Sequence, residues 1–243
     1  MKSLKIWAGA MSLALIISGC GGMSNTAKGS LIGTAAGGAA GTGIGALIGH
    51  LVGGSSGAKK GAIIGAAAGA AAGVTTGALI GHKMDKAAKA AKALENAKVE
   101  SIEDSNGLPG VKVTFENGIL FNVNKADLQA AAKTTLKQFA TDVLNANTDI
   151  DVAICGFASS DGSDETNLKL SQNRSDAVKN YLTGTCKVAT KQIKSSTGYG
   201  ENPDYLVKNA DGTEDVKASR RVEVYLIASD EMIKAAEAEA AKK

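Results

Sequence analysis

The chain has 243 residues, and its 27 basic and 24 acidic side chains leave a formal net charge of +3. This small charge, with aromatic residues at only 4%, argues against the basic surface typical of nucleic-acid-binding proteins. Basic residues predominate only in the N-terminal part, whereas the segment Val111–Ser229 holds 14 basic and 15 acidic residues. We therefore expect no nucleic-acid partner.

Residues 1–19 have the pattern of a secretory signal peptide, with Lys2 and Lys5 before the apolar stretch Ile6–Ile17. The stretch ends in Ile-Ser-Gly-Cys20, which resembles the bacterial lipobox, whose cysteine becomes the lipidated first residue. The resemblance implies a lipidated N-terminus at 20–28, with acyl chains such as palmitate on Cys20. An ordinary cleavage site beside a chance cysteine is the alternative. Gly21, in place of an aspartate, implies sorting to the outer membrane.

Glycines recur at every fourth position from Gly29 to Gly81 without a miss. Glycine costs a helix about 1 kcal/mol relative to alanine, so this pattern makes sense only where helices pack closely along the glycine ridge. Residues 29–50 repeat as 61–82, joined by a Gly/Ser-rich turn. The pattern predicts a glycine-zipper helical hairpin over 29–82 that could also join copies of the chain into a homo-oligomer.

Each repeat is 22 residues long, about 33 Å of helix, which is enough to cross a bilayer core. Lysines at the ends, such as Lys28 and Lys83, could reach lipid headgroups. We favour membrane insertion. Because the repeats hold few large apolar side chains, a soluble or peripheral zipper is the alternative. His50 and His82 end the repeats without nearby carboxylate or thiolate ligands, so we expect no metal site there.

A polar helical linker is expected over 83–107, where alanines alternate with lysines, either as a spacer or as a continuation of the second glycine helix. A compact domain is expected over 108–228. Its expected elements are strands at 111–115 and 119–123 joined by an Asn-Gly turn, a helix at 127–147, a strand at 149–155, a helix at 165–182, and strands at 191–199 and 221–228. This order predicts an α/β (α+β) two-layer sandwich. Residues 229–243 are expected to form a solvated tail. Cys155 and Cys186 are expected near opposite ends of a layer, as two separate, largely buried thiols.

The motif Gly156-Phe-Ala-Ser-Ser-Asp-Gly162, followed by Asn167, Leu170-Ser171 and Arg174, resembles the core motif of OmpA-like peptidoglycan-binding domains. Gly198-Tyr-Gly-Glu201 and Arg220-Arg-Val-Glu223 resemble the closing signature of that family. The resemblance covers about half of the chain. With the lipobox and the zipper, it also resembles a group of bacterial outer-membrane lipoproteins whose C-terminal domain lies in the periplasm.

The resemblance implies non-covalent binding of the diaminopimelate in the peptidoglycan stem peptide. Arg174 falls where the family has an arginine that holds the ligand carboxylate. Ser159 falls where the family has an aspartate for the ligand ammonium, so the loss of that charge would weaken binding, and Asp161 or Asp164 could replace it. Asn167 and Asn124 complete the implied site.

Each of these residues also has a structural interpretation. Arg174 could form a structural ion pair, Asn167 could start a helix, and Asn124 and Asp161 could be turn residues. Of Arg220 and Arg221, adjacent on a strand, one faces outward.

The leading hypothesis is an outer-membrane lipoprotein that tethers the membrane to the cell wall. The alternative is a structural or oligomerising lipoprotein whose domain binds peptidoglycan weakly or not at all, which Ser159 favours. Both histidines lie in the zipper and no phosphate loop, paired-carboxylate motif or metal cluster is present, so we expect neither an enzyme nor a cofactor.

Overall fold

The computed structural model describes residues 69–104, 108–116 and 120–242. The expected signal peptide, Cys20 and the glycine repeats before Gly69 lie outside these residues. The described part forms one five-stranded sheet in the order β1-β2-β5-β3-β4. The strands are β1 (Ala97–Glu103), β2 (Pro109–Glu116), β3 (Ile150–Phe157), β4 (Ile193–Gly198) and β5 (Arg221–Ala228).

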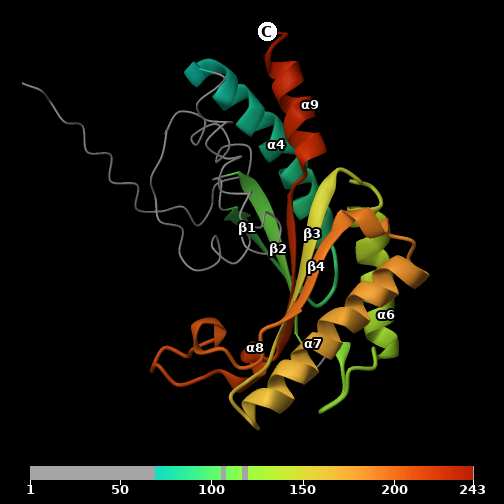
Figure 1. Ribbon diagram of the computed structural model, residues 1–243, viewed down its shortest axis with the longest axis vertical. Coiled ribbons are helices and arrows are strands. Elements are labelled where there is room, and N and C mark those ends of the chain that lie inside the picture. The colour runs from blue at the N-terminus through green and yellow to red at the C-terminus, as the bar shows by residue number, and fades with distance from the viewer. Residues whose placement is uncertain (1–68, 105–107, 117–119, 243) are drawn as a thin grey trace, which may run out of the picture.

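The central strand β5 runs antiparallel to both of its neighbours, β2 and β3, and all eight of its residues are buried. β3 and β4 are parallel, so the chain must cross over between them, and α7 (Asp164–Asn180) makes that crossing. The expected strand at 221–228 is confirmed, and those at 149–155 and 191–199 are confirmed with shifted ends. The expected two-layer architecture is confirmed as well (Figure 1).

Helices α6 (Ala130–Phe139) and α7 pack on one face of the sheet, and each continues into a π-helical turn, η3 (Ala140–Leu144) and η4 (Tyr181–Thr185). Ala132, Leu136 and Phe139 are buried on α6, on the face that the apolar spacing predicts. The Phe139 ring meets the edge of the β2 residue Phe115, with the centroids 5.6 Å apart. These contacts build the main core between the sheet and the helices.

The expected linker is not a spacer. Helix α4 runs without a break from Gly69 to Lys92, and its residues Ile80 and Met84 are fully inaccessible in the same core as Val111 and Val113 of β2. The last part of the second zipper repeat therefore belongs to the folded domain. The continuation of the second glycine helix into residues 83–92 is confirmed, whereas the interpretation of this segment as a spacer is wrong, because alanines that look like spacer residues pack the core.

The second half of the expected linker is strand β1, which pairs antiparallel with β2. The predicted hairpin partner at 119–123 is wrong: the described residues Leu120–Val123 form no strand, and Phe121 makes only an isolated bridge to Leu128. β1 and β5 already occupy both edges of β2, so β2 has no free edge for a third strand. The Asn117-Gly118 turn lies outside the described residues.

The expected solvated tail is also wrong, because helix α9 (Asp230–Ala240) buries Met232, Ala236 and Ala240. The Ser229 hydroxyl accepts a hydrogen bond from the Met232 amide and so begins the helix. α9 lies beside α4 and runs in the opposite direction (Figure 1). α9 stands at the end of the sheet where β5 finishes, whereas α4 continues from beside α9 along β2 and β1.

Two further expectations concern the cysteines and a membrane-spanning helix. Cys155 and Cys186 are both free, as predicted, and burial is the main cause that raises the pKa of each thiol. In the described ranges, no helix has the length and apolar character needed to cross a membrane.

Candidate functional site

The residues of the sequence motif meet where β3 ends and β5 begins. Helix α7 starts there, with Ser163 as its cap, and lies directly on the sheet. A Cβ atom on Gly156 of β3 would be 2.2 Å from the Ser171 carbonyl oxygen, and one on Gly198 of β4 would be 2.2 Å from the Gln172 nitrogen. These glycines let α7 approach the strands, and this close contact fixes the rest of the motif in place.

Arg174 lies on the buried side of α7 and is 3% exposed. Its Nε donates a hydrogen bond to the Lys125 carbonyl at 3.0 Å, and its guanidinium carbon is 5.4 Å from the centroid of the Phe121 ring. Burial, followed by the charge of Arg220, lowers the pKa of Arg174 to about 10. The side chain is therefore a cation at neutral pH, held between α7 and the segment after β2.

Ser159 begins the loop between β3 and α7 and is 2% exposed. Its hydroxyl donates to the exposed carboxylate of Asp161 across 3.4 Å. A carboxylate therefore lies two residues after position 159, against the serine hydroxyl. Asp164 lies exposed in the first turn of α7, and the Ser159 hydroxyl donates to Asp161 rather than to Asp164.

Asn167, in the first turns of α7, holds the loop between β3 and α7 in place through hydrogen bonds. Its amide nitrogen donates to the carbonyls of Ser159 at 3.2 Å and Asp161 at 2.9 Å, and also to the Glu201 carboxylate. The loop after β3 and the turn after β4 are thus held by one buried amide. Asn167 lies beyond the helix cap, which is Ser163, so the helix-start interpretation is wrong in detail.

Asn124 is exposed and has a φ of 54°, in the left-handed region that asparagine tolerates better than most residues. It belongs to the turn that carries the Lys125 carbonyl to Arg174. Asn124 is therefore a turn residue, and its exposed side chain is accessible to a ligand.

Arg220 is a residue that sequence reasoning left undecided. Arg221 places its guanidinium 4.1 Å from the Phe157 ring centroid, in the cluster on the face of the sheet opposite α6 and α7. Arg220 has an extended backbone, and side chains alternate along such a backbone, so Arg220 turns toward the helix side, where Arg174 lies. Alternation was available from the sequence, but which arginine faced which layer was not.

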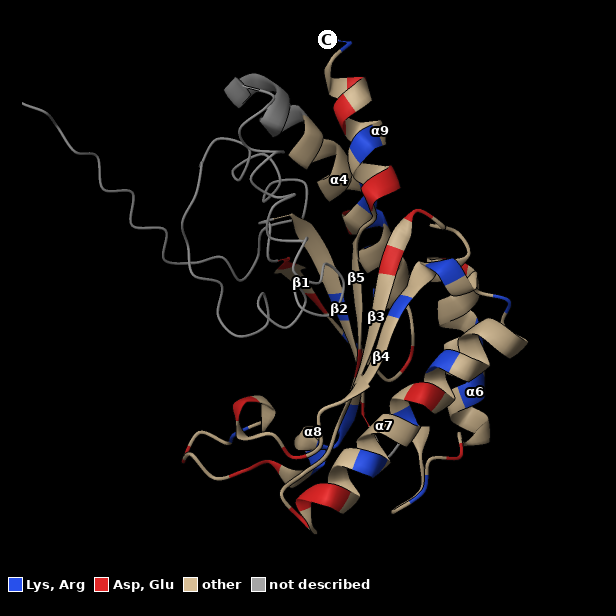
Figure 2. Ribbon diagram, in the orientation of Figure 1, with Lys and Arg blue, Asp and Glu red and all other residues tan. Residues whose placement is uncertain are grey.

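Two acidic residues of the long segment between β4 and β5 complete the surroundings. Glu214 accepts from the backbone nitrogen of Ser160 at 3.2 Å and from the Ser160 hydroxyl. Glu201 contacts Asn167 as described above. Basic and acidic side chains are interspersed around this end of α7 and the segment carrying α8 (Val216–Ser219), as Figure 2 shows. The arrangement suits a ligand that carries both charges.

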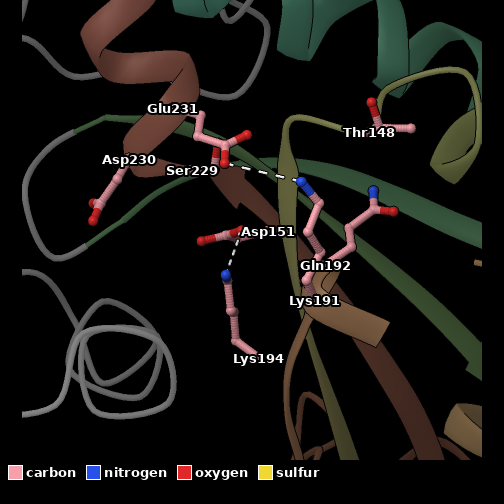
Figure 3. A pocket seen from close by; sticks show the side chains of 8 residues that line it. All are labelled: Thr148, Asp151, Lys191, Gln192, Lys194, Ser229, Asp230 and Glu231. Carbon is pink, nitrogen blue, oxygen red and sulfur yellow. Dashed lines mark ion pairs between the residues drawn. The ribbon is translucent and has the colours of Figure 1, made fainter. Parts of the chain in front are cut away.

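A separate depression of about 220 Å³ lies at the other end of β3 (Figure 3). Lys194 pairs with Asp151 at 3.2 Å, and Lys191 with Glu231 at 3.9 Å. Burial is the main cause that raises the pKa of Asp151. Because these basic and acidic groups pair with one another, we place the candidate site at the Arg174 end.

The described residues hold no group of His, Cys, Asp and Glu side chains suited to a metal ion. His82 is exposed on α4, and His50 lies outside the described residues.

Comparison with known proteins identifies two parts of the chain. Residues 120–221 match the OmpA family, and residues 1–85 match the YMGG-like Gly-zipper. The OmpA family consists of non-enzymatic peptidoglycan-binding domains.

Individual relatives each match half of the chain or less. Outer membrane protein P5 of Haemophilus influenzae is 35% identical over 91 residues, 37% of this chain and 24% of that protein. Outer membrane protein A of Serratia marcescens is 29% identical over 123 residues, 50% of this chain and 33% of that protein. The chain thus spans a third or less of these relatives. The structure of a putative MotB-like protein from Desulfovibrio vulgaris is 19% identical, with a TM-score of 0.49, over 63% of this chain and 96% of that one.

Proposed function

Because residues 120–221 are an OmpA-family domain, we propose that this chain is an outer-membrane lipoprotein that binds peptidoglycan without a covalent bond. The domain would tether the outer membrane to the cell wall from the periplasm. The observation that carries this proposal is the buried, cationic Arg174, held by Lys125 and Phe121 at the position of the family's carboxylate-binding arginine.

We propose that Arg174 receives a carboxylate of the stem peptide's diaminopimelate. A guanidinium presents a planar fork of donors that suits a carboxylate, and its burial strengthens the attraction. Arg220, turned to the same side of the sheet, adds positive charge. Asn167 holds the loop, and the exposed Asn124 lies on the turn beside Arg174, where its amide can reach the ligand.

Asp161 is proposed to receive the ligand ammonium in place of the missing aspartate at position 159. Its carboxylate already lies against the Ser159 hydroxyl, so Ser159 would position the charge rather than carry it. A charge-assisted hydrogen bond contributes about 1.5–3 kcal/mol, so binding depends measurably on this replacement.

The membrane side of the proposal rests on the sequence. The lipobox resemblance at Cys20 supports acylation, and more than one acyl chain gives stable anchoring. The zipper would add contacts between copies of the chain or with the membrane.

The alternative function is a structural or oligomerising lipoprotein whose domain binds peptidoglycan weakly or not at all. Ser159, which carries no charge, favours it.

Sedimentation of the full chain with purified sacculi separates the two functions. We expect co-sedimentation that the Arg174→Lys variant loses by about tenfold, because lysine keeps the charge without the fork. Lys169→Arg, an equally conservative change at an exposed position of α7, serves as the control. A folded wild-type chain that stays in the supernatant would favour the alternative.

A further inference from the structure

The outward face of α4 is basic. Lys83, Lys86, Lys89 and Lys92 are all exposed, and they alternate with the buried Met84, Ala87, Ala88 and Ala91. Helical spacing therefore puts the apolar side chains in the domain core and the lysines on the opposite, outer face. The helix carries one acidic residue in its last three turns, the half-buried Asp85.

Most of this charge is not neutralised within the described part of the chain. Lys83 pairs with Asp149 at 2.5 Å, but among the described residues no carboxylate forms an ion pair with Lys86, Lys89 or Lys92. The neighbouring helix α9 has acidic residues, of which Glu231 pairs with Lys191 rather than with α4. Three lysines are thus left facing outward on one helix.

The lysine face begins at the end of the sheet opposite the candidate ligand site, where Lys83 pairs with Asp149 just before β3, and runs from there along the sheet toward the start of β1. The loop with Ser159 lies where β5 begins, whereas α9, which packs on α4, follows the residue where β5 ends. Eight strand residues separate these ends by about 26 Å. Figure 1 shows the two helices at one end of the molecule and α8 at the other.

α4 is also the element that continues from the glycine zipper, with Gly73, Gly77 and Gly81 in the same unbroken helix. Because Ile80 and Met84 are fixed in the domain core, no flexible linker separates the lysines from the zipper. One end of the domain adjoins the zipper and, through the zipper, the proposed lipid anchor. That end faces the membrane when the other end faces the wall.

We propose that Lys86, Lys89 and Lys92 contact anionic phospholipid headgroups, so that the domain has a membrane-facing end as well as a wall-facing end. A lysine near an anionic membrane surface strengthens binding by about fivefold, and the effect fades with added salt. This contact depends on the membrane side of the proposed function and not on the ligand site.

The test uses the mature chain, residues 20–243, produced without acyl chains, and vesicles of phosphatidylcholine with or without about 30 mol % phosphatidylglycerol. We expect at least tenfold stronger binding to the anionic vesicles, reduced by salt. The triple variant Lys86→Glu, Lys89→Glu, Lys92→Glu should lose this preference. The triple Lys133→Glu, Lys137→Glu, Lys187→Glu, with the same charge change at exposed sites on α6 and beyond α7, should keep it.

Two results would overturn the proposal. The first is a wild-type chain with no preference for anionic vesicles, or an equal loss in both triple variants, which would reflect net charge alone. The second is an α4 triple variant that loses sacculus binding while its vesicle binding is unchanged. That result would mean that the lysines contact carboxylates of the cell wall. Circular dichroism checks that each variant is folded, and unchanged sacculus binding by the α4 triple separates this proposal from the proposed function.

Discussion

The Ser159 hydroxyl and the Asp161 carboxylate are joined by a hydrogen bond of 3.4 Å in the loop between β3 and α7. The pair places a carboxylate two residues after position 159. If Asp161 binds the ligand ammonium, its removal weakens binding although the motif position itself is unchanged.

We predict that Asp161→Asn lowers affinity for a diaminopimelate-containing stem peptide by about ten- to a hundredfold, the cost of one charge-assisted hydrogen bond. Adding Ser159→Asp to that variant should recover most of the loss, because the carboxylate returns to the family position. Isothermal calorimetry of the single and double variants measures both effects. An Asp161→Asn variant that binds like the wild type would remove Asp161 from the site.

The burial of Met84 predicts that α4 stabilises the domain. Met84→Ala should lower the free energy of unfolding by about 2–4 kcal/mol, because it leaves a cavity under a fully inaccessible side chain. Urea unfolding followed by circular dichroism measures the change. Lys86→Ala, on the exposed face of the same helix, should change stability by less than about 0.5 kcal/mol. If both substitutions had equally small effects, α4 would be a spacer that does not stabilise the domain.

The close approach of α7 to the sheet predicts a contrast between two glycines. Gly156→Ala should destabilise the domain by about 3 kcal/mol, since the added methyl would lie 2.2 Å from the Ser171 carbonyl oxygen. At Gly184, nothing lies within 4 Å of the added Cβ, so Gly184→Ala should leave the melting temperature unchanged or slightly raised. A stable Gly156→Ala variant would mean that α7 does not rest on β3 as described.

The pairing of β1 predicts a pH dependence. Burial raises the pKa of Glu100, but the hydrogen bonds and charges of Lys112 and Lys98 outweigh it and hold the pKa below its ordinary 4.5. A lowered folded-state pKa gives stability that is present above pH 4.5 and is lost as the pH falls through the folded value. Glu100→Gln should therefore cost about 0.5 kcal/mol at neutral pH.

That cost should shrink as the pH is lowered below 4.5, in chemical unfolding measured at several pH values. Glu95→Gln, at an exposed position just before β1, is the matched control and should show no such trend. A Glu100→Gln effect that is independent of pH would contradict the ion pair with Lys112.

The sequence predicts the part of the fold from α6 to β5 well because its signals are local. Leu136 and Phe139 mark the buried face of α6 by their spacing, and β5 combines alternation with a nearly continuous apolar run. The motif around Gly156 places the loop and α7 together because the glycine is required by their contact.

The other elements escape prediction because their signals depend on tertiary context. Alanines on α4, such as Ala87 and Ala91, resemble those of a solvated helix until a sheet covers them. β1 holds Lys98 and Glu100, whose charges are stabilised by a neighbouring strand rather than by an apolar pattern. In the same way, only the layer that contains Phe157 decides that Arg221 turns away from Arg174.

The central claim is that Arg174 binds the stem peptide, and calorimetry with a soluble, diaminopimelate-containing stem peptide tests it most directly. The wild-type chain should bind, and Arg174→Lys should bind about ten- to a hundredfold more weakly, at an unchanged melting temperature. A wild-type chain that is folded and does not bind, or a folded Arg174→Lys variant that binds equally well, would contradict the claim.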